Sequence, residues 1–185
     1  ETGADASSSK IFAGPNAAVI DYHNGPVLGM ACQSINDPTL VTAGADGALG
    51  VWTRDGTLVG KHKFQISDVD SEDCVVSITS ITSAPCNSNF AVGTSIGCIF
   101  LLSGKPKSQN NVLVDLVSLG NLQLCREPIT SVIFHPEKDI LAAISESNAF
   151  IVDTSPQKGS ISLCVLAHTS FSGHLASLCL SLIHI

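Results

Sequence analysis

Histidines and cysteines near the C-terminal end of the sequence are the first candidates for chemistry, because both residue types bind metal ions. They are Cys164, His168, His174 and Cys179. Zinc sites in proteins use short, regular ligand spacings such as Cys-x-x-Cys paired with a similar histidine pair. The four residues match none of these spacings. We therefore predict no metal site here and no cofactor in the chain.

Acidic residues gather in one polar segment, at Asp68, Asp70, Glu72 and Asp73. Closely spaced carboxylates can coordinate Ca²⁺, but the regular D-x-D-x-D-G frame with a distal glutamate is missing. We interpret the segment as a solvated loop that could also be phosphorylated. Its negative charge would favour a protein partner with a basic surface.

Proton transfer would need titratable side chains at the ends of the apolar segments, and Asp46, His135 and Asp139 are the few that qualify. We expect His135, in a Phe-His-Pro sequence, to face solvent where a strand ends. The sequence contains no G-x-S-x-G, no HExxH and no phosphate-binding glycine loop. We predict a protein that is not an enzyme. An enzyme that brings these three side chains into one pocket is the alternative.

The composition argues against several other classes of function. With 185 residues, of which 44% are hydrophobic, the chain is long enough for one domain with a core. Its net charge is −7 and it has only 9 lysines and arginines, whereas nucleic acids are bound by clustered basic residues. We therefore predict no nucleic-acid partner. No apolar run is long enough to span a bilayer, so we also predict no membrane partner.

The cysteines indicate the redox environment. There are 7 of them, irregularly spaced and without a C-x-x-C pair, which favours free thiols over a disulfide framework. Free thiols are typical of the reducing cytosol. We therefore predict a cytoplasmic protein.

Short apolar segments separated by turns organise the sequence. The breaks in the first group contain the Gly, Asn or Asp residues that tight turns require. No long stretch has the 3.6-residue periodicity of an amphipathic helix. The predicted strands are 17–22, 27–32, 39–43, 48–52 and 57–62, then 75–81, 89–93, 98–102 and 112–117, and finally 129–134, 140–144, 149–153 and 160–166.

These segments form repeated groups of four. The third strand of each group ends at Trp52, Leu102 or Val152, which gives a spacing of 50 residues both times. Repeats of this length with four strands each are typical of a β-propeller. We therefore predict an all-β fold, namely a partial β-propeller of about three four-stranded antiparallel blades with fragments of flanking blades.

The first group resembles a blade of the WD-repeat propeller family, with its Gly-His…Trp-Asp frame. His23 stands before the first strand, Asp46 lies in the turn between the second and third strands, and Trp52 closes the third strand. The resemblance implies that these side chains and a threonine on the second strand, here Thr42, form a buried hydrogen-bond network with a structural role. Thr53 stands where the family usually has aspartate.

The later groups match the family pattern less well. Ile96-Gly97 replaces Asp-Gly and Leu102-Ser103 replaces Trp-Asp, while Val152-Asp153 in the third group keeps only the aspartate. We therefore expect the turns of these two blades to be held by apolar packing alone. Both blades should be softer than the first.

The sequence divides into three parts. Residues 1–16 are polar and are expected to be a disordered lead-in. Residues 17–180 are expected to form the partial propeller, with blades at about 23–64, 74–118 and 126–167 and the start of a further blade at 174. Residues 181–185 are interpreted as a non-native tail, because the terminal Leu-Ser-Leu-Ile-His-Ile resembles the translation of an adapter used in sequencing libraries. A genuine terminal strand is the alternative.

A propeller closes with typically four to eight blades, so we expect a fragment of a larger protein, with the remaining blades among its partners. The resemblance implies a non-enzymatic scaffold that docks other proteins on its blade loops, here 35–37, 65–73, 103–111 and 155–159. The repeats are also similar to those of large cilia- and flagella-associated WD-repeat proteins, which implies a location in the cytoskeleton or cilium. The alternatives are a propeller that belongs to an enzyme and a propeller that contacts RNA.

Overall fold

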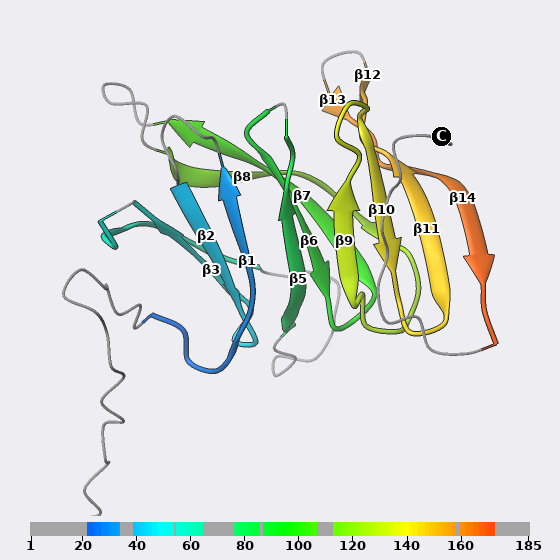
Figure 1. The fold of residues 1–185 in the computed structure, drawn as a ribbon, viewed down its shortest axis with the longest axis horizontal. Helices are drawn as coiled ribbons and strands as arrows, with labels where there is room; N and C mark the ends of the chain where they lie inside the picture. Colours follow the sequence, from blue (N-terminus) through cyan, green and yellow to red (C-terminus); the bar gives the residue numbers. More distant parts are fainter. Residues whose placement is uncertain are drawn as a thin grey trace, which may run out of the picture.

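Three antiparallel sheets of four strands each form the framework of the protein (Figure 1). The computed structural model describes residues 22–33, 39–53, 55–64, 76–85, 87–106, 113–157 and 160–172. Within these residues there is no helix, and a separate small hairpin completes the set of sheets. The prediction of an all-β partial β-propeller is confirmed.

The sheets are three successive blades, with strand orders β1-β2-β3-β4, β5-β6-β7-β8 and β9-β10-β11-β14. The strand bounds are β1 Val27–Gln33, β2 Thr39–Gly44, β3 Ala48–Trp52, β4 Leu58–Lys63, β5 Ile78–Ser83, β6 Asn89–Thr94, β7 Cys98–Pro106, β8 Leu113–Gln123, β9 Ser131–Phe134, β10 Ile140–Ile144, β11 Asn148–Asp153, β12 Pro156–Gln157, β13 Ser160–Ile161 and β14 Cys164–Ser170.

Glycine permits the tight turn between the second and third strands of the first two blades. Gly47 has a φ of 72° and Gly97 a φ of 79°, a region that side chains with a Cβ avoid. In both turns the glycine amide donates to the carbonyl three residues earlier, that of Gly44 or Thr94, at 3.2 Å. The two turns therefore have the same backbone geometry, although only the first has an aspartate before its glycine.

The blades pack face to face, and the middle blade shares a core with each neighbour. Alternate residues of β7 point to opposite sides, as the period of a strand requires. Phe100 and Leu102 belong to the core shared with the first blade, which includes Val41 and Val51. Leu101 belongs to the core shared with the third blade. The continuous apolar run of β7 is thus explained by burial on both faces.

The pairing register repeats from blade to blade. Trp52 pairs with Leu40, Leu102 with Phe90 and Val152 with Leu141. In each blade the register between the third and outermost strands shifts just before these residues, at 51/52, 101/102 and 151/152. The three residues, all buried, therefore occupy matching places, and the 50-residue spacing read from the sequence is a structural repeat.

The first strands of the blades lie side by side and run in the same direction (Figure 1). Near the beginning of β5, the Thr79 hydroxyl donates to the carbonyl of Ile129, just before β9. At the end of β5, the Ser83 hydroxyl donates to the carbonyl of Cys32, near the end of β1, at 2.8 Å. Turns that follow second strands and loops that follow first strands therefore lie at opposite ends of the blades.

Several predicted strand bounds differ from the structure. The segment 160–166 is not the single strand we predicted, because its first residues pair with β12 as a hairpin and the outermost strand is β14. β14 begins only at Cys164, and its apolar residues follow the hairpin so closely that the sequence shows one apolar run over both. The predicted strand 129–134 begins at Ser131. The amide of Ile129 bonds to the carbonyl of Thr94 in the second blade, and the amide of Thr130 bonds to the carbonyl of Ile144 at the end of β10.

Candidate functional site

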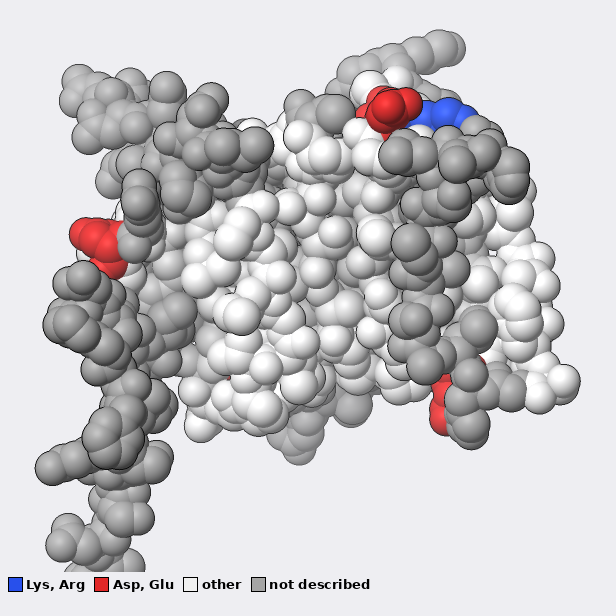
Figure 2. All heavy atoms as spheres, in the orientation of Figure 1, with Lys and Arg blue, Asp and Glu red and all other residues white. Residues whose placement is uncertain are grey.

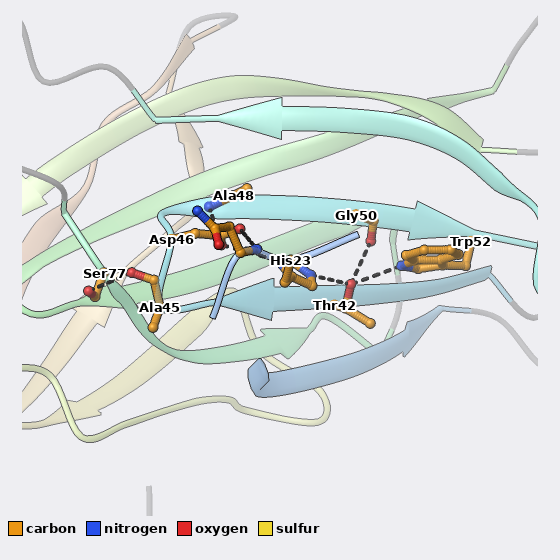
Figure 3. A network of polar contacts seen from close by, with 9 residues as sticks. His23, Thr42, Ala45, Asp46, Ala48, Gly50, Trp52 and Ser77 are labelled. Carbon is orange, nitrogen blue, oxygen red and sulfur yellow. Dashed lines mark hydrogen bonds and ion pairs between the residues drawn. The ribbon is translucent and has the colours of Figure 1, made fainter. Parts of the chain in front are cut away.

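The first blade contains a chain of polar contacts that joins three of its segments (Figure 3). The His23 ring lies 3.1 Å from the Asp46 carboxylate through Nδ1 and 2.8 Å from the Thr42 hydroxyl through Nε2. The indole Nε1 of Trp52 donates to the same hydroxyl at 2.9 Å. The structure thus brings together the four side chains that the resemblance singled out.

The hydrogens in this chain follow from what each group can donate. Trp52 Nε1–H can only donate, so the Thr42 oxygen accepts from it. The Thr42 hydroxyl then donates to His23 Nε2, and His23 Nδ1–H donates to the Asp46 carboxylate, which can only accept. All four groups are satisfied, as buried polar groups need to be.

The Asp46 carboxylate closes the turn between β2 and β3. It accepts from the backbone amide of Asn24 at 2.8 Å and from that of Ala48 at 3.2 Å. Partial burial by itself would raise the pKa of Asp46, but the bonds from the Asn24 amide, His23 and the Ala48 amide outweigh it, so the pKa lies below its ordinary value. Both carboxylate oxygens and both imidazole nitrogens are engaged inside the fold, which suits a structural role and leaves no open base.

The turn of the first blade also holds the second blade. The Ser77 hydroxyl donates to the carbonyl of Ala45 at 2.7 Å (Figure 3). The amide of Ser95, in the corresponding turn of the second blade, donates to the carbonyl of Ser77 at 2.9 Å. Side-chain and backbone bonds therefore connect successive turns along this end of the blades.

In the second blade a threonine takes over part of the network. The buried Thr94 hydroxyl accepts from the amide of Cys98 at 3.1 Å and lies 2.9 Å from the Cys98 carbonyl, to which it can donate. Our expectation that apolar packing alone holds this turn is therefore wrong, since one hydroxyl bridges the two strands that flank it.

In the third blade the same expectation is wrong for a different reason. The Glu127 carboxylate accepts from the hydroxyls of Ser145 at 2.7 Å and Ser147 at 2.6 Å, and from the side-chain amide of Asn148 at 3.2 Å. The hydroxyls of Ser147 and Ser145 are the main reason that the pKa of Glu127 falls from 4.5 to about 2. The positions of donor and acceptor are exchanged relative to the first blade. There the histidine donor precedes the first strand and the carboxylate lies in the turn, whereas here the carboxylate precedes the first strand and the donors lie in the turn.

Sequence reasoning missed Glu127, although a positional signal exists. His23 lies four residues before the start of β1, and Glu127 lies four residues before the start of β9. A search for any side chain able to hydrogen-bond at that position, rather than for histidine, would have found it. The hydroxyl-rich turn Ser145 to Ser147 is the second part of that signal.

The residues that could have formed a catalytic centre do not converge. Asp46 lies in a turn that follows a second strand, whereas His135 and Asp139 follow a first strand, at the opposite end of the blades. Nδ1 of His135 accepts from the amides of Glu137 and Lys138 at 3.1 Å each. The expectation that His135 faces solvent is wrong: only 3% of it is exposed, because the neighbouring blade covers it.

The other sequence candidates are only partly described. His168 and Ser170 bond to the side-chain oxygen of Asn148, at 3.1 and 2.7 Å. Within the described ranges, no group of three or more His, Cys, Asp or Glu could hold a metal ion. Nor does this part of the chain contain a helix long and apolar enough to cross a bilayer. Outside the described residues lie His174, Cys179, the loop 35–37 and the acidic residues Asp68, Asp70, Glu72 and Asp73.

Comparison with known proteins identifies the fold. No protein-family model and no curated protein sequence matches the chain. The crystal structure of Saccharomyces cerevisiae Sqt1 is similar with a TM-score of 0.64 and 16% identity, over 84% of this chain and 38% of Sqt1. Chaetomium thermophilum Sqt1, bound to the N-terminus of the ribosomal protein L10, is similar with a TM-score of 0.60 and 22% identity, over 83% of this chain and 39% of that one.

Both of these structures are WD40 β-propellers. At such identities the likeness shows the fold alone. The chain spans about two fifths of the length of either Sqt1 chain.

Proposed function

We propose that this chain is a non-enzymatic scaffold, part of a WD-repeat propeller that docks other proteins on the loops of its blades. The observation that carries the proposal is that the polar side chains of the first-blade network make their hydrogen bonds inside the fold. The side chains of the first-blade network, His23, Thr42, Asp46 and Trp52, bond to one another and to the backbone, so they hold loops in place rather than meeting a substrate.

The mechanism is geometric. Blades that share apolar cores and a repeated register form a rigid base, and the loops between strands are displayed on it. The similarity to a propeller whose structure contains a bound segment of another protein supports this kind of use. With a net charge of −7, the chain suits partners with basic surfaces. The acidic residues 68–73 are our first choice for such a contact.

We also propose that further blades cover the two faces at the ends of the stack. The large apolar side chains that are exposed in the described residues lie on β1 and on or just after β14: Val27, Leu28, Met30, Val165, Leu166 and Phe171. Apolar side chains gathered at such places are typical of a surface that packs against protein. A cytoplasmic location, in the cytoskeleton or cilium, is part of the same proposal and rests on the sequence alone.

Site-specific photo-cross-linking in an extract of the expressing cells tests the docking proposal. A benzophenone amino acid is placed at residue 87, exposed between β5 and β6, at residue 70 in the acidic segment, or, as a control, at residue 61, exposed on β4. We expect a protein to be cross-linked from 70 or 87, and to bind again when purified, but not from 61. Cross-links from 61 alone, or none at any position, would contradict docking on loops.

A further inference from the structure

An asparagine–glycine pair, Asn24-Gly25, lies in the segment that leads from His23 to β1. It is the only such pair in the sequence. Both residues are exposed. Among the described residues, neither the side chain of Asn24 nor the amide of Gly25 makes a hydrogen bond. The two groups of this pair that can react with each other are therefore not engaged elsewhere in the described structure.

Asparagine is a chemically labile residue, and it loses its side-chain amide fastest when glycine follows. The glycine nitrogen gives its proton to hydroxide and attacks Cγ of the asparagine. A C–N bond forms, the bond from Cγ to Nδ2 breaks, and ammonia leaves with a proton taken from water. Water then opens the resulting succinimide ring at either carbonyl carbon, which gives aspartate or isoaspartate. Glycine favours the attack because it has no Cβ to hinder it.

The fold requires the glycine of this pair. Gly25 has a φ of 143°, which residues with a Cβ rarely adopt, so a larger residue that would slow the reaction does not fit without strain. The segment is anchored on either side of the reactive peptide bond. The Asn24 amide donates to Asp46 at 2.8 Å, and the Pro26 carbonyl accepts from the Ala45 amide at 3.0 Å.

The product carries a negative charge at the edge of the first-blade network. Asn24 and Asp46 line the same open cavity of about 450 Å³, and Lys63 is the basic residue in its lining. On the face shown in Figure 2, the basic atoms of the described residues lie at the upper edge, whereas β1 begins in the lower part of the same view (Figure 1). Repulsion between exposed charges is weak in water, so the charge alone has a small effect.

The larger effect comes from the main chain. In isoaspartate the chain runs through Cβ and Cγ, which adds one backbone atom, or about 1.5 Å of chain. The added atom lies between the two anchoring bonds, that of the Asn24 amide to Asp46 and that of Pro26 to Ala45. Both bonds cannot keep their geometry. Asp46 is also the acceptor for His23 (Figure 3), so the disturbance reaches the network directly.

We propose that Asn24 is a site of spontaneous deamidation, and that isoaspartate formed there weakens the hydrogen-bond network of the first blade. The reaction needs only water and hydroxide. It makes the first blade the part of the described chain that loosens as the protein ages. The proposal is independent of whether the blade loops dock other proteins.

Mass spectrometry of the folded chain tests the site. The protein is incubated at mildly alkaline pH, and its proteolytic fragments are examined for the gain of one mass unit at each asparagine. Asn87 and Asn121 are internal comparators, because both are exposed but are followed by serine and leucine. We expect Asn24 to convert several times faster than either, and an isoaspartyl methyltransferase should label the product. Asn24→Gln keeps the backbone donor but would need a six-membered ring, so it should take no label at this position.

Urea unfolding followed by the fluorescence of Trp52 tests the effect on the network. Ion exchange separates the deamidated fraction by its added charge. That fraction should unfold at a lower urea concentration than the unmodified chain, and also lower than Asn24→Asp, which has the charge without the added backbone atom. Asn24→Gln should keep its midpoint after the same incubation.

Two results would overturn the proposal. Conversion of Asn24 no faster than that of Asn87 and Asn121 would show that the fold protects the pair. A deamidated fraction rich in isoaspartate that unfolds at the same urea concentration as the unmodified chain would show that the network does not depend on this segment.

Discussion

Replacing Thr42 by valine removes the one atom on which the first-blade network converges. The Thr42 oxygen accepts from Trp52 at 2.9 Å and lies 2.8 Å from Nε2 of His23. Valine has nearly the same shape, so the change leaves two buried polar groups without a partner and creates little space. Only 4% of Trp52 is exposed, so water cannot replace the lost bond.

The expected loss of stability follows from those two groups. An unpaired buried donor or acceptor costs about 1–3 kcal/mol, and the added methyl group recovers a part of this. We therefore expect Thr42→Val to lower the free energy of unfolding by about 2–4 kcal/mol. Urea unfolding followed by far-UV circular dichroism measures it, and the single tryptophan gives a local signal from the network itself.

A control and a double mutant make the test specific. Thr169→Val, exposed on β14, should change stability by less than about 0.5 kcal/mol. Trp52→Phe deletes the indole donor of the same hydrogen bond. The double variant should therefore lose less free energy of unfolding than the sum of the losses in Thr42→Val and Trp52→Phe. A Thr42→Val protein as stable as Thr169→Val, or strictly additive effects, would refute the view that this network holds the blade.

Three further predictions concern the other blades and the core. Trp52→Ala should lower stability by about 3–5 kcal/mol in urea unfolding, the range for buried aromatic truncations, and a loss below about 1 kcal/mol would show that Trp52 does not anchor the core. The pKa of Glu127 is lowered from 4.5 to about 2, so its contribution to stability is complete above pH 4.5 and is lost as the pH falls toward 2; Glu127→Gln should flatten the stability profile over that window in acid titrations, and an unchanged slope would contradict its role. Gly97→Ala should destabilise strongly in thermal unfolding, because φ is 79° and the new Cβ would lie 2.3 Å from the carbonyl oxygen of Cys125, whereas Gly120→Ala meets nothing nearer than 3.8 Å and should be tolerated; equal melting temperatures would contradict the turn geometry.

The sequence predicted a structural feature correctly where only one type of residue can adopt the required conformation. Gly47 and Gly97 mark turns because only glycine takes their φ without strain, and the strand β3 was predicted at its true bounds. The continuous apolar run from Cys98 to Leu102 in β7 is the pattern of a strand buried on both faces, and the structure buries it on both. The 50-residue spacing of Trp52, Leu102 and Val152 fixed the repeat before any pairing was known.

The features that were missed depend on contacts between segments distant in the sequence. Glu127 performs in the third blade what His23 and Asp46 perform in the first, but with donor and acceptor exchanged, so a pattern of residue types does not reveal it. The burial of His135 depends on a loop of the neighbouring blade. The hairpin of β12 and β13 lies directly before β14, and Ile161 and the residues from Leu163 to Leu166 form one apolar run, so the sequence does not show where the hairpin ends and β14 begins.

Methyl NOE spectroscopy of the intact chain tests most directly whether the sheets stack as successive blades. Leu101 and Leu102 are neighbours on β7, yet they belong to cores on opposite sides of the middle blade. We predict NOEs from Leu102 to Val41 or Val51 in the first blade and from Leu101 to Leu141 or Val152 in the third, without crossing. NOEs from both leucines to the same neighbouring sheet would contradict the stacked arrangement.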